Sequence, residues 1–181
     1  IENSARLFNY QKEKVFISIK KKVFEERNWF FADSSFLNIF DIKIVKHSKS
    51  MSFNHPFTVL ITESTAQKYF GDENPIGKRI YYEQQVPFTV IGIIEDIPNQ
   101  THFSINVLAS FSSLNYMIGE LQRSWIWNPC WTYLLLREDA NPKQLSEKFP
   151  FYMENYFYDA EKDYMELKLQ PIEKIHLYSD L

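Results

Sequence analysis

Alternating apolar and polar positions mark several short strands along this chain. Residues 15–20 alternate between aliphatic and other side chains, and the pattern returns at 105–111. A period of two places alternate side chains on opposite faces of a sheet, so both stretches predict β-strands. Residues 28–32 and 131–137 are rich in aromatic and β-branched residues and are also predicted strands. A last strand is expected at Met165–Leu169, where the alternation appears once more.

The clearest boundary signals lie between residues 56 and 71. Residues 57–61 form a β-branched run typical of a strand. Thr62 follows as a helix N-cap, and Gly71 stands where a left-handed C-cap residue belongs. The helix between them is expected to bury one face, made by Ala66, Tyr69 and Phe70.

Turn residues then predict a hairpin. The sequence Asn74-Pro75-Ile76-Gly77 places Pro second and Gly fourth, which is typical of a type I turn. Residues 78–83 and 86–95 follow as two strands joined at Gln84-Gln85. Residues 90–94 are apolar on both faces, which predicts a central strand, and Gly92 marks a place where a neighbour packs close.

Three helices are expected elsewhere. The polar residues 33–35 can cap a short helix whose apolar side is formed by Phe36, Leu37 and Phe40. Residues 114–121 have the spacing of an amphipathic helix. Asn141, followed by Pro, begins a third helix, which should kink or break at Pro150 because proline disrupts a helix interior.

Composition narrows the class of protein. The chain has 181 residues, 45% hydrophobic and 17% aromatic, enough for one domain or two small lobes with a buried core. Its formal net charge is −3, so it lacks the basic footprint of a nucleic-acid-binding protein. The run Lys20–Lys22 is followed by Glu25 and Glu26, as at a solvated strand end. Only four glycines are present, which argues against a glycine-rich phosphate loop.

No known catalytic, cofactor or metal motif occurs in the sequence. Histidines 47, 55, 102 and 176 are scattered without the local spacing of metal ligands. Cys130 is alone in an apolar context, which indicates an inert, buried thiol. No residue is therefore assigned a catalytic, cofactor-binding or metal-binding role.

Two functional hypotheses remain open from the residues alone. The first is a hydrolase in which carboxylates such as Glu63, Glu95 and Asp96 pair as general acid and base. Ordinary positions also explain these residues, since Glu63 lies in a helix first turn and the other two at a strand exit.

The second hypothesis is a secreted carbohydrate- or peptide-binding module. It would use the aromatic cluster that runs from Trp125 to Tyr133. Aromatic side chains of this kind also fill cores and interfaces, which is the favoured interpretation. The residues concerned are Tyr116, Trp125, Trp127, Trp131 and Tyr133.

Several blocks of the sequence together resemble one family. They are ADSSFLNIFDI from Ala32, TVLITESTAQKYFGDENPIGKRI from Thr58, FTVIGIIEDIP from Phe88, THFSINVLASFSSL from Thr101 and LKLQPIEKIHLYSDL from Leu167. In this order they resemble the extracytoplasmic MacB-type core domain of FtsX-like ABC-transporter permeases, in the branch typical of Bacteroidetes. The resemblance covers nearly the whole chain, and the central block from Thr58 is its most specific part.

The resemblance implies an α+β fold in two parts. A porter-like lobe of βαβ units would comprise residues 1–22 and 104–181, and a second mixed α/β lobe, residues 23–103, would be inserted within it. Relatives usually begin the porter-like lobe with a further strand and helix, which this chain would lack. His47-Ser48-Lys49 also stands where relatives commonly carry Gly, so this turn is expected to differ.

The resemblance further implies a non-catalytic role without cofactors. Such domains lie between the first two transmembrane helices of a permease, at the periplasmic face of the bacterial inner membrane. Expected partners are a cytoplasmic ATP-binding subunit, a second permease copy, and a periplasmic adaptor or substrate protein, but no nucleic acid. No apolar run here approaches the roughly 20 residues of a spanning helix, so one such helix is expected before Ile1 and three after Leu181.

Overall fold

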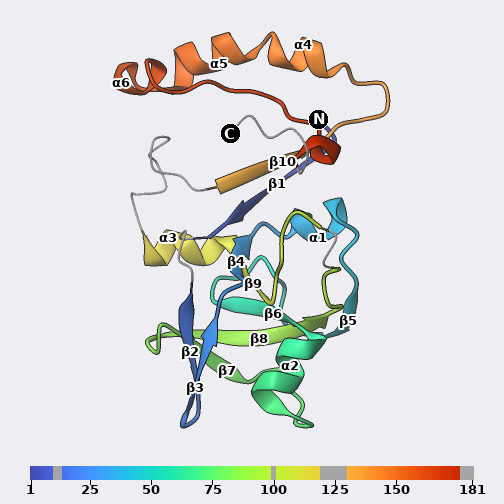
Figure 1. Ribbon diagram of the computed structural model, residues 1–181, viewed down its shortest axis with the longest axis vertical. Coiled ribbons are helices and arrows are strands. Elements are labelled where there is room, and N and C mark those ends of the chain that lie inside the picture. Colours follow the sequence, from blue (N-terminus) through green and yellow to red (C-terminus); the bar gives the residue numbers. More distant parts are fainter. Residues whose placement is uncertain (10–13, 99–100, 119–129, 176–181) are drawn as a thin grey trace.

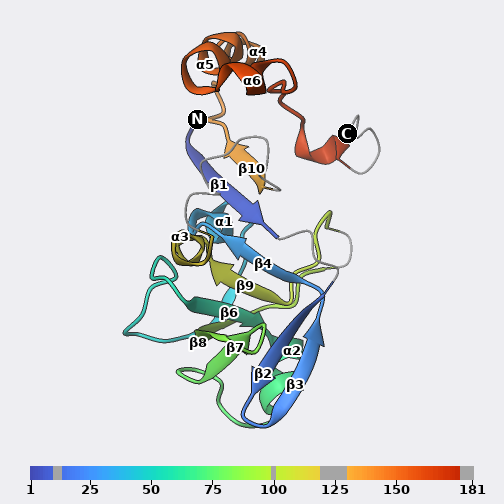
Figure 2. The same cartoon turned by 90° about the vertical axis from the view of Figure 1, so that its left-hand side faces the viewer.

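A ten-stranded mixed sheet forms the body of the protein (Figures 1 and 2). The computed structural model describes residues 1–9, 14–98, 101–118 and 130–175. The strands are β1 (Asn3–Phe8), β2 (Val15–Ile19), β3 (Lys22–Glu26), β4 (Trp29–Ala32), β5 (Ile44–His47), β6 (Thr58–Thr62), β7 (Arg79–Tyr82), β8 (Val86–Ile94), β9 (Val107–Ser110) and β10 (Cys130–Leu135). The helices are α1 (Ser35–Ile39), α2 (Glu63–Phe70), α3 (Leu114–Met117), α4 (Pro142–Ser146), α5 (Phe149–Tyr156) and α6 (Asp159–Lys162), with 3₁₀ turns η1 (Phe111–Ser113) and η3 (Ile172–Lys174).

The strands follow the order β10-β1-β4-β9-β6-β8-β7-β2-β3, and β5 pairs with the C-terminal part of β8. The pairs β4–β9 and β6–β8 are parallel, and the other pairs are antiparallel. The α4–α6 helices lie at one end of the elongated molecule and the β2–β3 hairpin at the other (Figure 1). The sheet therefore links the two ends of the domain.

The central strands bury side chains on both faces of the sheet. In β4 every residue is buried: Trp29 and Phe31 join one apolar cluster, and Phe30 and Ala32 join another. The same division holds along β6 and β9. Strands enclosed on both faces form the stiffest part of such a fold because each side chain packs against close neighbours.

Helix α2 begins and ends as its sequence predicts. The Thr62 side chain accepts a hydrogen bond from the Thr65 N–H at 3.3 Å, which confirms the N-cap. Gly71 ends the helix as predicted, but with φ +58° and ψ −130° it lies outside the left-handed helical region that was expected, in a positive-φ conformation that favours glycine. Ala66, Tyr69 and Phe70 are buried in the first cluster, as the spacing predicts.

The predicted β7–β8 hairpin is confirmed, but the turn before it is shifted. Glu83 and Gln84 both have positive φ, as a type I′ hairpin turn requires. The preceding turn closes with a hydrogen bond from the Lys78 N–H to the Pro75 carbonyl, one residue later than expected. Gly77 has φ +83° and so occupies the third position of a type II turn, where glycine is required.

Gly92 stands where a neighbouring backbone passes close, as predicted. A Cβ there would lie 2.6 Å from Leu60 Cδ2 and 3.1 Å from the Lys46 carbonyl oxygen. Glycine therefore permits β5 to pack against β8 beside β6.

The helix expected after Asn141 is broken near Pro150, as predicted. Asn141 Oδ1 accepts from the Lys143 N–H at 2.9 Å and begins α4. The chain then leaves the helix at Glu147, and α5 starts afresh with Pro150 in its first turn. Proline in the first turn leaves no required hydrogen bond unmade.

The strand predicted at Met165–Leu169 is wrong as an assignment, because these residues form no strand. Their burial still alternates, with Met165, Leu167 and Leu169 half-buried and the residues between them exposed. A strand requires a hydrogen-bonded neighbour, and no strand among the described residues pairs with this segment.

The two-lobe division at residues 22–23 and 103–104 stays a prediction. The sheet crosses both boundaries: β2 pairs with β3, and β4 and β6 both pair with β9. Relative movement of the two parts would therefore bend or open these pairings.

Candidate functional site

A shallow groove among the described residues is a candidate binding site. It has a volume of about 430 Å³ and lies where α2, its C-terminal loop and β5 meet. Its lining residues are Val45, Lys46, Glu63, Ala66, Gln67, Gly71, Asp72, Glu73, Asn74, Pro75 and Ile93. The groove is therefore mixed in polarity, without a dominant apolar wall.

The charges of this groove are partly compensated by neighbouring lysines. Glu73 accepts hydrogen bonds from Lys78 and, at 3.4 Å, from Lys20. The bond from Lys78, then that from Lys20, lowers the pKa of Glu73 below its ordinary value. The groove thus has a solvated, acidic lining. None of its lining residues is a nucleophile placed next to a base.

The carboxylates proposed for hydrolysis follow the ends of two neighbouring parallel strands, since Thr62 of β6 lies opposite Ile94 of β8. Asp96 accepts hydrogen bonds from the Ser64 N–H at 3.2 Å and the Ser64 hydroxyl at 2.7 Å, so it stabilises the start of α2. Glu63 lines the groove, whereas Glu95 does not. In the part of the chain that the structure describes, no hydrogen bond or shared donor links Glu63 to Glu95.

A buried carboxylate that sequence reasoning missed connects three elements. Glu26 at the end of β3 is only 3% exposed. Its Oε1 accepts from Asn106 Nδ2 at 2.6 Å, and its Oε2 accepts from the Tyr69 hydroxyl at 2.9 Å and from Lys68 Nζ at 3.1 Å. Glu26, which follows the Lys20–Lys22 run in the sequence, is therefore buried and bonded, whereas Glu25 beside it is exposed.

The environment of Glu26 stabilises its charged form. Burial acts to raise its pKa, but the bonds from Asn106 and Lys68 outweigh that and hold the pKa below its ordinary value. Burial and the neighbouring carboxylate raise the pKa of Tyr69, so its hydroxyl remains a donor. All the polar groups are satisfied, and the network ties β3 to α2 and to the start of β9. The network is therefore structural. The only signal for it in the sequence was the predicted burial of Tyr69, which lies one helical turn after Thr65 on the buried face of α2.

No cluster of three potential metal ligands occurs among the described residues. His47 Nδ1 lies 2.9 Å from the Ser48 carbonyl oxygen, and His102 Nε2 lies 2.8 Å from the Tyr133 hydroxyl. His176 lies outside the described residues. Cys130 is half-buried, and burial raises its pKa to about 11, so its thiol stays protonated at neutral pH.

The described members of the aromatic cluster do not form one platform. Tyr133 packs between α1 and the 101–103 segment, with its ring centroid 4.9 Å from that of Phe40. Trp131 lies near Phe30 at 6.4 Å, and Tyr116 near Phe57 at 5.5 Å. Trp125 and Trp127 lie outside the described residues. Trp131 and Tyr133 thus contact one apolar cluster, whereas Tyr116 contacts Phe57 beside the other cluster.

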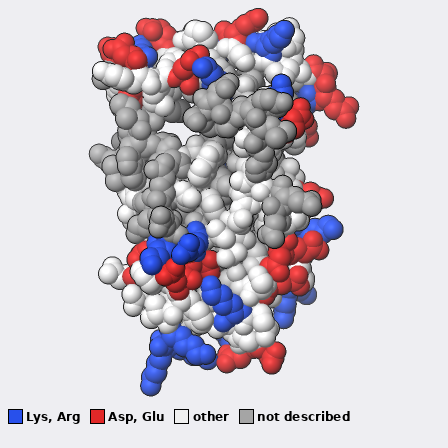
Figure 3. Space-filling view, in the orientation of Figure 1, with Lys and Arg blue, Asp and Glu red and all other residues white. Residues whose placement is uncertain are grey.

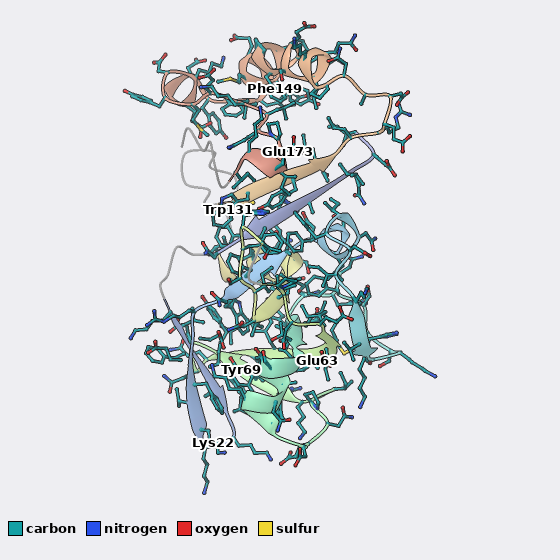
Figure 4. All side chains as sticks on the ribbon, turned by 45° about the vertical axis from the view of Figure 1, so that its right-hand side comes forward. Lys22, Glu63, Tyr69, Trp131, Phe149 and Glu173 are labelled. Atoms are coloured by element: carbon teal, nitrogen blue, oxygen red, sulfur yellow. The ribbon has the colours of Figure 1, made fainter. Side chains whose placement is uncertain are left out.

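The surface carries both signs of charge. Figure 3 shows Lys and Arg side chains interspersed with Asp and Glu at both ends of the molecule. Figure 4 places Lys22 at the tip of the β2–β3 hairpin, far from Phe149 on α5. Within the described ranges no helix is long and apolar enough to cross a membrane.

A family model of the MacB-like periplasmic core domain matches residues 10–150, more than half of the chain. The chain therefore belongs to the MacB-like periplasmic core domain family, as the sequence blocks indicate. No curated protein matches the chain.

Solved structures share this fold. A domain of a permease protein from Porphyromonas gingivalis has a TM-score of 0.73 at 23% identity, covering 87% of this chain and 65% of that one. The periplasmic region of MacB from Actinobacillus actinomycetemcomitans has a TM-score of 0.63 at 17% identity, covering 86% and 68%. The extracellular domain of the noncanonic ABC-type transporter YknZ from Gram-positive bacteria has a TM-score of 0.61 at 14% identity, covering 86% and 76%.

These likenesses confirm the mixed α/β fold class. The chain spans about 65% of the Porphyromonas gingivalis domain, so that domain has further residues beyond the matched part. The family is that of a transporter's periplasmic domain.

Proposed function

We propose that this chain is the extracytoplasmic domain of an ABC-type permease and transmits ATP-driven conformational change across the inner membrane, for export or signalling. The single observation that carries the proposal is the family match over residues 10–150. The domain itself performs no catalysis in this proposal and needs no cofactor. ATP would be hydrolysed by a cytoplasmic ATP-binding subunit.

An element that transmits a conformational change must move as a rigid body, without deforming internally. The sheet suits this role because it runs from β10 to β3 and its central strands are buried on both faces. The ring centroid of Phe31 lies 6.2 Å from the ring centroids of Trp29 and Phe88. These edge-to-face contacts oppose sliding of one strand past another. The tie at Glu26 fixes the base of the β2–β3 hairpin to α2.

The membrane setting and the partners belong to the same proposal. The intact permease would form a dimer at the periplasmic face of the inner membrane, and a periplasmic adaptor or substrate protein would contact the domain. The division into residues 1–22 plus 104–181 and 23–103 is kept as the proposed unit of movement. If these parts move separately, the sheet must yield at the pairings that cross the division, which are β1–β4, β2–β3, β2–β7, β4–β9 and β6–β9.

Distance measurements in the intact permease test the proposal. Spin labels at Lys22→Cys in the two protomers should change their separation between the nucleotide-free and ATP-bound states. Lys22 is suitable because it is exposed at the hairpin tip (Figure 4). A control pair within residues 23–103, Val23→Cys with Gln67→Cys, should keep its distance because the Glu26 tie joins β3 to α2.

Two results would contradict the proposal. One is an unchanged separation between protomers while the permease still hydrolyses ATP and turns over. The other is a full-length gene product without membrane helices.

A further inference from the structure

A two-stranded ribbon of β1 and β10 lies between the α4–α6 helices and the other strands, β2–β9, which we call the main sheet (Figure 2). Within the ribbon the two strands pair along six residues, from Asn3 to Phe8 of β1. β1 pairs with β4 only at Leu7 and Phe8, and no other described strand pairs with either strand of the ribbon. Two residue pairs are therefore the whole strand pairing between the ribbon and the main sheet among the described residues.

A second short pairing in the same sheet shows how such a joint is reinforced. β2 also pairs with β7 at two residues, Ile17 and Ser18. There the buried carboxylate of Glu26 ties the hairpin to α2 through Lys68 and Tyr69. A joint of two residue pairs twists easily unless side chains cross it, so the ribbon requires a comparable tie.

Arg6 supplies this tie at the point where β4 ends. Asp33 Oδ2 accepts from the Arg6 backbone N–H at 3.0 Å and from its Nε at 2.8 Å, and Asp33 Oδ1 accepts from Arg6 Nη2 at 2.9 Å. The Asp33 N–H donates in turn to the Arg6 carbonyl at 3.2 Å. The pair thus continues the β1–β4 ladder by one step beyond the strand. A carboxylate held at both oxygens by one guanidinium has a fixed orientation, which a single-contact ion pair lacks.

The guanidinium of Arg6 also stacks on a ring of the main sheet's core. Its Cζ lies 3.8 Å from the centroid of the buried Phe111 ring. Phe111 follows β9 as Asp33 follows β4, and Ala32 and Ser110 lie opposite each other at the ends of these parallel strands. Arg6 therefore joins the ribbon to the carboxyl ends of two neighbouring strands at once.

The two faces of the ribbon are attached in different ways. On one face Tyr133, opposite Ala5, packs against Phe36 and Phe40 at centroid distances of 6.1 and 4.9 Å. Arg6 lies on the other face, because successive side chains of a strand alternate. A ribbon held on one face alone tilts about that attachment, so the Arg6 contact on the second face determines its angle.

We infer that the Arg6–Asp33 pair is a latch that fixes the angle of the ribbon, and with it α4–α6, against the main sheet. The inference rests on the proposed function in that the latch would carry the transmitted displacement across this joint. Arg6 and Asp33 are positioning residues, since they act through the placement of the ribbon. Their side chains are 50% and 28% exposed, so the latch can be broken without opening the core.

Spin labels within one protomer of the full-length permease test the latch. Native cysteines, Cys130 among them, are replaced by serine, and labels at Gln144→Cys on α4 and Gln67→Cys on α2 report the angle of the joint from exposed positions. Arg6→Lys keeps the charge but loses the two-pronged contact, and Asp33→Asn keeps the size of the side chain but loses its charge. Each variant should widen the distribution of label distances about twofold, because the ribbon then tilts on its remaining attachment.

Lys14→Gln is the matched control. Lys14 pairs with Glu25 at 3.0 Å, and their side chains are 47% and 40% exposed, so this variant breaks an ion pair of similar exposure away from the joint. It should leave the distribution unchanged. The double variant Arg6→Lys with Asp33→Asn should widen the distribution no further than either single variant, because the two residues act as one unit.

A second readout follows the transmitted displacement. In a permease whose Lys22 labels change their separation on binding ATP, Arg6→Lys should reduce that change at least about twofold while ATP hydrolysis continues, because the loosened joint absorbs part of the movement.

Three results would overturn the latch. They are unchanged distributions in Arg6→Lys and Asp33→Asn, equal widening in the Lys14→Gln control, and an undiminished Lys22 response in the variant whose joint has loosened. The width of the intraprotomer distribution requires no nucleotide, so failure of the latch and failure of the proposed transmission are distinguishable.

Discussion

Two regions of this domain differ sharply in how they are stabilised. The packed end, β6–β8 with α2, contributes to apolar clusters on both faces of the sheet. The open end, β10 with α4–α6, has no buried residue in β10, α4 or α5. Its side chains include the exposed Trp131, Phe151 and Tyr152. The packed end is thus specified by its own residues, while the open end presents surfaces suited to partners.

The comparison also separates two kinds of information in a sequence. At the packed end, caps, turns and strands are local features whose partners lie in the same block. At the open end, residues 165–169 alternate in burial as a strand would, but none of the described strands pairs with them. Hydrophobic alternation thus indicates that a segment can form a strand, and pairing with a neighbour decides whether it does.

The largest expected effect contrasts one phenylalanine from each region. Phe31 has 0% exposure in the clustered core and Phe151 is 66% exposed on α5. Phe31→Ala should lower the free energy of unfolding by about 4 kcal/mol, since it removes a buried ring and leaves a cavity. Phe151→Ala should change it by less than about 0.5 kcal/mol. Urea unfolding followed by circular dichroism measures both, and equal losses would refute the contrast between the two ends.

A smaller but pH-dependent effect is expected at Glu26. Glu26→Gln should cost about 2 kcal/mol at neutral pH, because one buried oxygen acceptor becomes a donor, while Lys68, 44% exposed, stays solvated. The matched control is Glu25→Gln, since Glu25 is exposed on the same strand and pairs with Lys14 at the surface. Its effect should be slight.

The pH dependence follows from the lowered pKa of Glu26. A carboxylate whose pKa is lower in the folded than in the unfolded state stabilises the fold above its unfolded pKa, ordinarily about 4.5. That contribution is lost as the pH falls from about 4.5 through the folded-state pKa. The stability difference between the native protein and Glu26→Gln should therefore shrink over that acidic range. A difference that stays constant from pH 7 to about pH 3 would show that Glu26 contributes through packing alone.

Much of the fold could be predicted because the relevant signals are local. Thr62 and Gly71 bound α2 where expected, and Gly92 lies at the expected close approach. The turn at Pro75 lies one residue later than predicted. The sequence from Asn74 to Lys78 suits both a type I turn with Pro75 second and a type II turn with Gly77 third. The burial of Glu26 was not predictable, since Asn106 and Lys68 are distant from it in sequence and only the fold brings them together.

Functional features were likewise predictable only where they depend on the residues themselves and not on contacts made by the fold. Absence of a catalytic motif and the family resemblance both followed from residues that can be compared one by one. The separation of Trp131 from Tyr116 could not be foreseen, because neighbours in sequence diverge once β10 joins β1 and α3 packs elsewhere.

The smallest effect is expected at two helix N-caps, each of which uses a side-chain oxygen as the acceptor. Thr62 caps α2 at the packed end, and Asn141 caps α4 at the open end, each accepting a bond from a backbone N–H. Thr62→Ala should lower global stability by about 1 kcal/mol, since α2 cannot fray without exposing Tyr69 and Phe70. Asn141→Ala should change global stability by less than about 0.3 kcal/mol and instead speed amide exchange in residues 142–156, because α4 buries nothing that opposes local opening. Urea midpoints together with hydrogen exchange separate the two results. Equal global losses would mean that α4 unfolds only with the sheet, so that the two ends form a single cooperative unit despite their different packing.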